Sequence, residues 1–241
     1  MSWIRTILKW IKTNIIDRFA VPGLPVHAHS PVSLDTLGST ILRYNNMQSY
    51  WRLGVQTWTF VAKGVTIHKI HAPQAALIAS AVRSQPATSV VPQTIALALM
   101  ASESLLDPLC QNGNFLGSNP TKELSGFDMG ICQLKLKYVT APGVSNVDDA
   151  KTFAFDPSKA IPYLYALVAG KIEWARETIA GHRSALPQWN DPFILAVGAF
   201  KLGQTGVMAF YQGGSWAAEL DDFVKLESWF ASQLGVPSAL A

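Results

Sequence analysis

The sequence predicts a mainly α-helical protein, and three observations support that prediction. Apolar residues recur at three- and four-residue steps through most of the chain. Prolines stand near the first turn of several of these segments, where a helix tolerates them. The composition, with 49% hydrophobic and 15% charged residues, is typical of a chain with a large buried core. At 241 residues the chain is long enough for one large domain, or for a core domain with an appendage.

Residues 1–20 are predicted to form an amphipathic helix. Arg5, Lys9 and Lys12 lie on the face opposite an apolar stripe. Two interpretations stay open: the helix docks on the protein's own core or on a partner chain, or it lies on an anionic membrane. Basic residues interrupt the apolar stretch and no small-residue cleavage site follows, so we do not expect a cleaved signal peptide. The stripe consists of Trp3, Ile4, Ile7, Leu8, Ile11, Ile15, Ile16 and Phe19.

The net charge of the chain is concentrated at its beginning. Residues 1–18 contain four basic residues and one acidic residue, which makes +3, whereas the rest contains 15 basic and 15 acidic residues. A neutral body argues against the broad basic surface of a nucleic-acid-binding protein. No stretch approaches the roughly 18 to 20 uninterrupted apolar residues of a membrane span, so we expect no transmembrane helix.

The region before the core domain is predicted to be a linker followed by helices. Residues 21–33 contain three prolines and no apolar period, which indicates a linker. Residues 34–84 are predicted to form a helical region that packs on the core. Its first part, 34–61, has the period of one long helix, although the Thr, Val and Ile of residues 55–70 also fit a strand. A second helix is predicted over 72–85.

Residues 85–241 are predicted to form the core domain, built around one enclosed helix. Residues 92–104 are apolar nearly all round, as expected of a central helix, and Asp107-Pro108 ends the segment. Residues 109–127 are rich in Asn, Gly, Ser and Pro, which predicts a loop.

The remainder of the core domain is predicted to be helical after two further connections. The short segment 128–139 is followed by another predicted loop, 140–155. Asp156 then fits the N-cap of a long helix, because its carboxylate can accept a backbone N–H, and Pro157 suits the first turn. The last predicted helices lie within residues 191–211 and 217–234.

Glu103 is the first candidate for chemistry, because it ends an otherwise apolar helix. Burial and the negative end of the helix dipole both disfavour a charged carboxylate there. A carboxyl that keeps its proton near neutrality is what glycosidic-bond cleavage requires of a general acid. The alternative is an ordinary glutamate at a helix end that points into solvent.

Four segments that follow one another along the chain give Glu103 a context. They are "ESLLDP" (103–108), "GICQL" (130–134), "DPSKAIPYLYAL" (156–167) and "AVGAFKLGQTGV" (196–207). In this order the chain resembles the soluble-type lytic transglycosylases and, more distantly, the goose-type lysozymes, over about residues 85–215. The resemblance implies a lysozyme-like α-helical transglycosylase domain with an N-terminal helical extension, and a protein that cleaves peptidoglycan glycan strands.

The resemblance also implies roles for individual residues. Glu103 matches the catalytic acid of the family, and Ser104 matches the serine that helps to order the cleft. Gly130 matches a glycine that lets backbone approach the sugar closely. Gln133 offers an amide that can bind an N-acetyl group or hold the glutamate. Without the family pattern, Gly130 and Gln133 would be a turn glycine and a surface glutamine.

Two residues of the predicted substrate site depart from the family pattern. Phe200 stands where the family has a tyrosine and so lacks the hydroxyl, and Lys201 places a charge where the family has an amide. Either change can lower activity or shift substrate preference. A second interpretation is therefore kept, in which the protein retains the lysozyme-like fold as a non-catalytic structural or assembly protein of a virion or secretion machine.

The resemblance implies a mechanism with a single carboxylate. In lytic transglycosylases one glutamate protonates the leaving oxygen and then removes the proton of the muramic acid 6-hydroxyl, which leaves a 1,6-anhydro product. A hydrolytic muramidase would need a second carboxylate, for which Asp128 is the candidate, although it also fits a loop-capping residue. Goose-type enzymes have an acid shortly after their motif glutamine, where this chain has Lys135.

The remaining reactive side chains predict no cofactor. Cys110 and Cys132 either pair or are two separate buried thiols. The histidine pairs His27/His29 and His68/His71 have no carboxylate or cysteine cluster around them, so no metal site is expected. The expected partner is peptidoglycan, with residues 1–20 available to dock on a virion, a membrane or a partner chain. We therefore expect the protein in a virion or in the periplasm and cell-wall space.

Overall fold

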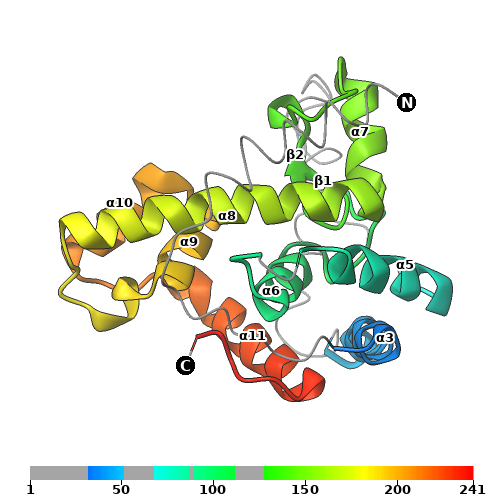
Figure 1. The fold of residues 1–241 in the computed structure, drawn as a ribbon, viewed down its shortest axis with the longest axis horizontal. Coiled ribbons are helices and arrows are strands. Elements are labelled where there is room, and N and C mark those ends of the chain that lie inside the picture. The colour runs from blue at the N-terminus through cyan, green and yellow to red at the C-terminus, as the bar shows by residue number, and fades with distance from the viewer. Residues whose placement is uncertain (1–31, 52–67, 87–88, 112–127, 241) are drawn as a thin grey trace. The chain divides into compact units, whose positions relative to one another are not determined.

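The computed structural model confirms the prediction of a mainly α-helical protein (Figure 1). All of the residues that it describes belong to one compact unit, Pro31–Ala241. The predictions for residues 1–20, for most of the linker, and for the helix or strand over 52–67 lie outside the described residues. The described ranges are 32–51, 68–86, 89–111 and 128–240, with residues 87–88 omitted.

The described residues form eight α-helices, three short 3₁₀ helices and one two-stranded antiparallel hairpin. The α-helices are α3 (Leu34–Trp51), α5 (Ala72–Arg83), α6 (Gln93–Ser104), α7 (Val147–Phe155), α8 (Pro157–Gly181), α9 (Pro192–Lys201), α10 (Gly203–Gly213) and α11 (Asp221–Leu234). The 3₁₀ helices are η4 (Leu136–Tyr138), η5 (Pro187–Asn190) and η6 (Ala218–Leu220). The strands are β1 (Asp128–Met129) and β2 (Leu134–Lys135), paired so that Asp128 lies opposite Lys135.

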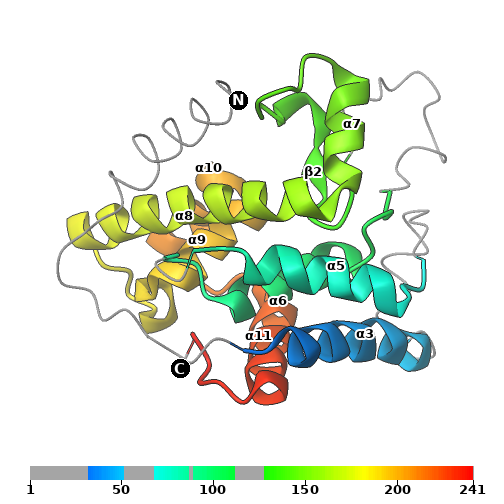
Figure 2. The same ribbon diagram turned by 45° about the vertical axis from the view of Figure 1, so that its right-hand side comes forward.

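Helix α6 is the centre of the fold, as the sequence predicts. The seven residues from Ile95 to Ala101 are all fully buried, so no face of this segment meets solvent. Helix α11 packs against α6, and in both ribbon views α6 lies between α8 and α11 (Figures 1 and 2). Burying a leucine or isoleucine side chain contributes about 1.5 to 3 kcal/mol, so this helix is a large part of the driving force for folding.

The region before the core packs onto it, as predicted. Helix α3 contacts both α5 and α11. The ring of Tyr44 lies 5.5 Å from that of Trp229 and 5.3 Å from that of Phe230, measured between centroids. Burial, and to a smaller extent the charge of Asp222, raises the pKa of Tyr44. This aromatic cluster joins the first described helix to the last one.

Helix α8 begins where the sequence predicts. The carboxylate of Asp156 accepts the backbone N–H of Ser158 at 3.0 Å, and Pro157 is the first helical residue. Both Asp156 and Pro157 therefore define a helix start, which is the structural role expected of an Asp-Pro pair. Helix α8 packs against α5, α7 and α9, so this one start point fixes the position of a helix that crosses much of the unit.

The predicted loop over 140–155 is wrong in its second half, where α7 forms. The side chain of Asn146 caps the helix by accepting the N–H of Asp149 at 2.9 Å. Asp148 and Asp149 lie in the first turn, where negative charge favours a helix. The buried residues Ala150 and Ala154 give α7 a narrow apolar face, too weak a pattern to stand out in a short segment.

Asp191 is a half-buried carboxylate at the start of α9, and its charge affects the stability of the fold. It caps α9 by accepting the N–H groups of Phe193 and Ile194 at 2.7 and 3.2 Å. Burial raises the pKa of Asp191, and the nearby charge of Glu227 raises it further. A raised pKa means that ionised Asp191 is less favourable in the folded than in the unfolded protein. Its contribution to stability therefore falls as pH rises above the ordinary range of an aspartate.

We expect Asp191→Asn to keep the free energy of unfolding at pH 7 or to increase it, because the amide oxygen still caps α9 and the buried charge is gone. The advantage over wild type should disappear at pH 3, where Asp191 is protonated. Asp191→Ala removes the cap and should cost about 1 kcal/mol at pH 3, and less at pH 7, where it also removes the unfavourable charge. Urea denaturation at the two pH values measures these differences. A loss at pH 7 as large for Asn as for Ala would contradict the expectation.

Candidate active site

Glu103 lies in the last turn of α6, at the point where the buried helix reaches the surface of the unit. The residues from Thr94 to Ala101 are buried, whereas 26% of the Glu103 side-chain surface is exposed. Glu103 is thus neither sealed in the core nor bathed in solvent. Its role as a general acid stays a prediction.

An ion pair joins Glu103 to Lys201, the last residue of α9. The ammonium nitrogen Nζ of Lys201 lies 2.7 Å from Oε1 of Glu103 and donates a second hydrogen bond to the hydroxyl of Ser102 at 3.1 Å. Only 15% of the Lys201 side chain is exposed. Solvent therefore screens this pair less than a surface pair, although both groups have lost hydration. The family resemblance predicts a substrate-binding role for Lys201 and gives no indication of its ion pair with Glu103.

Ser104 connects the end of α6 to the segment that follows the undescribed loop. Its buried hydroxyl oxygen lies 2.9 Å from the carbonyl oxygen of Met100 and 2.7 Å from that of Ile131. A hydroxyl has one hydrogen, so it donates to one of these carbonyls at a time. The contact with Ile131 brings the segment 130–134 against the helix that carries Glu103. The ordering role that the family resemblance implies for Ser104 fits this geometry.

Gln133 uses its side chain to close the turn in which it lies. Its amide nitrogen Nε2 donates to the carbonyl oxygens of Gly130 at 2.9 Å and Cys110 at 3.3 Å. The backbone N–H of Gln133 also donates to Gly130, at 3.1 Å. The predicted contact of Gln133 with a sugar N-acetyl group stays a prediction. The bonds that the structure shows give it a role in shaping the turn.

Gly130 is required by packing. Its φ is +75°, a conformation that glycine adopts freely, and a Cβ added there would lie 1.8 Å from the carbonyl oxygen of Ala154 in α7. The structure thus supplies a reason for this glycine that the sequence analysis did not consider. Close approach of a sugar to the Gly130 backbone stays a prediction.

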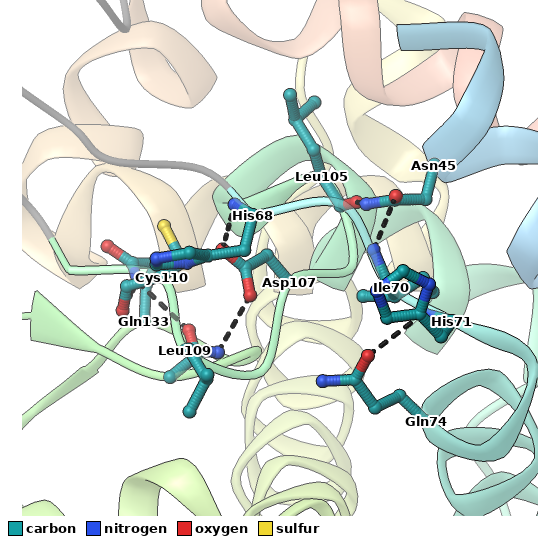
Figure 3. Close-up of polar contacts among 11 residues, drawn as sticks. Asn45, His68, Ile70, His71, Gln74, Leu105, Asp107, Leu109, Cys110 and Gln133 are labelled. Carbon is teal, nitrogen blue, oxygen red and sulfur yellow. Dashed lines mark hydrogen bonds and ion pairs between the residues drawn. The ribbon is translucent and has the colours of Figure 1, made fainter. Parts of the chain in front are cut away.

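The chain directly after Ser104 is held in a strained turn by a polar network (Figure 3). Leu105 and Leu106 both have positive φ, at 55° and 64°. Asn45 of α3 donates from its amide to the carbonyl oxygen of Leu105 at 3.0 Å and accepts the N–H of Ile70 at 3.0 Å. The network thus joins α3 and the chain before α5 to the end of α6.

Asp107 is the other anchor of this network. It is buried, and its Oδ2 accepts the backbone N–H of His68 at 2.7 Å and lies 2.9 Å from the Nδ1 of the same histidine (Figure 3). Its Oδ1 accepts the N–H of Leu109 at 2.8 Å. The interpretation of Asp107 as a residue that ends α6, rather than as a catalyst, agrees with these bonds.

Among the described residues, non-glycine residues with a left-handed backbone occur only in segments 103–108 and 130–134, two of the four that carry the family resemblance. A left-handed conformation costs about 1 to 2 kcal/mol at a residue with a side chain. Among the described residues, the non-glycine positions with positive φ are Leu105, Leu106 and Gln133. Strain of this kind persists only where surrounding contacts impose it, and it concentrates at functional sites.

Both cysteines are buried free thiols, so the interpretation as two separate thiols is confirmed. Burial raises the pKa of Cys110 to about 12, with smaller contributions from the charges of Asp107 and Glu103. Burial, and then the charge of Glu103, also raises the pKa of Cys132. Neither thiol is thus a nucleophile at neutral pH.

The structure does not bring every predicted site residue into contact with Glu103. Phe200 is half-buried and packs against the core one residue before Lys201. Asp128, the candidate second carboxylate, is half-buried in β1 opposite Lys135. Among the described residues, no group of three His, Cys, Asp or Glu side chains is arranged to hold a metal ion.

Comparisons with known proteins do not assign a function to this chain, so its function has to be inferred from its own residues. No family model, curated protein or solved structure matches the chain. Within the described part of the chain, none of the helices has the length and apolar character to cross a bilayer.

The packing of Gly130 predicts a large effect of a single methyl group. Gly130→Ala should lower the free energy of unfolding by several kcal/mol, because the new Cβ collides with the backbone of α7 and the φ is unfavourable. Gly143→Ala is the matched control, since Gly143 also has a positive φ, of 84°, but has no atom within 4 Å of an added Cβ. It should lose only about 1 kcal/mol. Equal losses in urea denaturation would show that the contact with Ala154 is not limiting.

Proposed function

We propose that the protein is a peptidoglycan lytic transglycosylase that cleaves the β-1,4 bond between N-acetylmuramic acid and N-acetylglucosamine, with Glu103 as its single acid and base. One observation supports this proposal above the others. Residues from three distant segments meet at the end of one enclosed helix, where Lys201 binds Glu103 and Ser104 contacts the carbonyl of Ile131. These are three of the four segments on which the family resemblance rests.

The geometry at Glu103 suits a carboxyl that handles one proton. Its side chain is partly exposed, so a glycan can reach it, yet the helix behind it is buried and rigidly held. In the proposed reaction the proton of Glu103 moves to the glycosidic oxygen as the bond to the muramic C1 breaks. The carboxylate then takes the proton of the 6-hydroxyl as that oxygen bonds to C1. The glutamate is restored, and a 1,6-anhydro end is formed.

A second function is favoured by the same ion pair. A carboxylate bound to an ammonium at 2.7 Å is a stable structural contact, and a protein that keeps the fold for assembly alone has no need of a free acid. The alternative proposal is therefore a non-catalytic structural protein of a virion or a secretion machine. A hydrolytic muramidase that uses Asp128 is a further alternative, distinguished by its products.

For the active protein we propose a place in a virion, where the enzyme opens the cell wall during genome entry. A periplasmic or secretion-associated enzyme would use the same chemistry on the same polymer. Residues 1–20, with their basic and apolar faces, are the proposed attachment to a particle, a membrane or a partner chain.

The decisive experiment incubates peptidoglycan sacculi with wild-type protein and with Glu103→Gln. We expect the wild type to release muropeptides with 1,6-anhydro ends, seen by mass spectrometry. The glutamine variant should be at least about 10³-fold slower, because an amide cannot donate the proton. Glu173→Gln, at an exposed site on α8, is the matched control and should keep wild-type activity.

Other outcomes select other functions. Reducing ends in place of anhydro ends would identify a hydrolase. No release by folded wild-type protein, with circular dichroism identical to that of Glu103→Gln, would contradict the enzymatic proposal and favour the structural protein.

A further inference from the structure

The contact between Lys201 and Glu103 differs from the other lysine–carboxylate pairs of the described residues. Lys159–Asp156 and Lys225–Asp222 span one turn of a helix, have lysine side chains that are more than half exposed, and have separations of 3.3 and 3.9 Å between nitrogen and oxygen. Lys201–Glu103 is shorter, at 2.7 Å, is mostly buried, and joins residues 98 positions apart. An enclosed lysine loses side-chain conformational freedom, so the contacts that hold it must offset that loss.

The position of this pair explains why a cation is needed there. Glu103 is in the last turn of α6, where the negative end of the helix dipole disfavours a second negative charge. A carboxylate at such a helix end gains from a compensating positive charge. Lys201 supplies that charge and is anchored by a second hydrogen bond to Ser102.

We infer that Lys201 is a positioning residue of the proposed reaction: its ammonium fixes Oε1 of Glu103, so that Oε2 carries the proton that is donated and taken back. This inference rests on the proposed function. The hydrogen bond to Oε1 restricts the rotation of the carboxyl group, and this orientation is part of what lowers the barrier of a general-acid step.

The same ammonium acts on the charge that the reaction creates. When the proton leaves Oε2 for the glycosidic oxygen, Glu103 becomes an anion beside a cation that is already in place. The proton returns to Oε2 from the 6-hydroxyl in the second step, and Lys201 keeps its own protons throughout. Lys201 thus contributes to the transition state without touching the sugar. The resemblance alone would assign this position to substrate binding.

Steady-state kinetics distinguish a positioning role of Lys201, which changes kcat, from a role in substrate binding, which changes KM. We propose measuring initial rates on a concentration series of soluble, uncrosslinked glycan strands, with release of 1,6-anhydro ends as the readout. Lys201→Met should lower kcat by about 10² to 10³-fold and leave KM within about twofold, because the interaction is with the acid. Lys201→Arg keeps a cation within reach of Oε1 and should recover at least a tenth of the wild-type kcat.

Two controls keep the result interpretable. Lys225→Met removes the ammonium of an exposed pair and should leave kcat and KM unchanged. Thermal unfolding tests whether Lys201→Met folds. If it does not, Lys201→Gln is used instead, which keeps a hydrogen-bond donor but no charge and should lose at least tenfold in kcat.

The inference about Lys201 can fail while the proposed function stands. Wild-type kcat in a folded Met or Gln variant would overturn it. So would a raised KM at unchanged kcat, which would assign Lys201 to substrate binding, or an arginine variant as inactive as the methionine variant. Absence of anhydro products from the wild-type protein would instead overturn the proposed function.

Discussion

The structure depends on one constraint: helix α6, which is buried from Thr94 to Ala101, must end in a defined way where it reaches the surface of the unit. Side chains and a tight turn hold this end in place. Asn45 donates to the carbonyl oxygen of Leu105, the hydroxyl of Ser104 lies against those of Met100 and Ile131, and two left-handed leucines turn the chain away. Because these contacts come from separate parts of the chain, the end of α6 has a single position.

A helix end that is fixed in this way also fixes whatever side chain it carries. Glu103 precedes Ser104, the last residue of α6, and Lys201 contacts Glu103 from the end of α9. The same packing thus places a carboxylate at the C-terminal end of α6 and an ammonium beside it. In our proposal the protein uses this arrangement for chemistry, since a carboxyl held on one oxygen and partly exposed is a group that can pass a proton in a defined direction.

The sequence predicts those parts of the structure that depend on local pattern. The unbroken apolar run of α6 and the Asp156-Pro157 start of α8 are both correct, because burial and capping act within a few residues. Helix α7 was missed because its apolar face consists of little more than two alanines.

The contacts at Glu103 could not be predicted in this way, since they join residues far apart in the chain. The same holds for the turn after α6, where Asn45 binds Leu105 and His68 binds Asp107 across long stretches of sequence. One signal was present for Lys201. It is the lone charged residue of α9, whose residues from Ile194 to Ala199 are all buried, so its ammonium needed a partner.

A crystal structure of Glu103→Gln with a bound tetrasaccharide of alternating N-acetylglucosamine and N-acetylmuramic acid would test directly whether Glu103 is the catalytic acid. We expect a glycosidic oxygen about 3 Å from the side chain of residue 103, on the side away from Lys201. An oligosaccharide bound at a distance from residue 103, or displacing Lys201 from it, would show that Glu103 is not the acid held by Lys201.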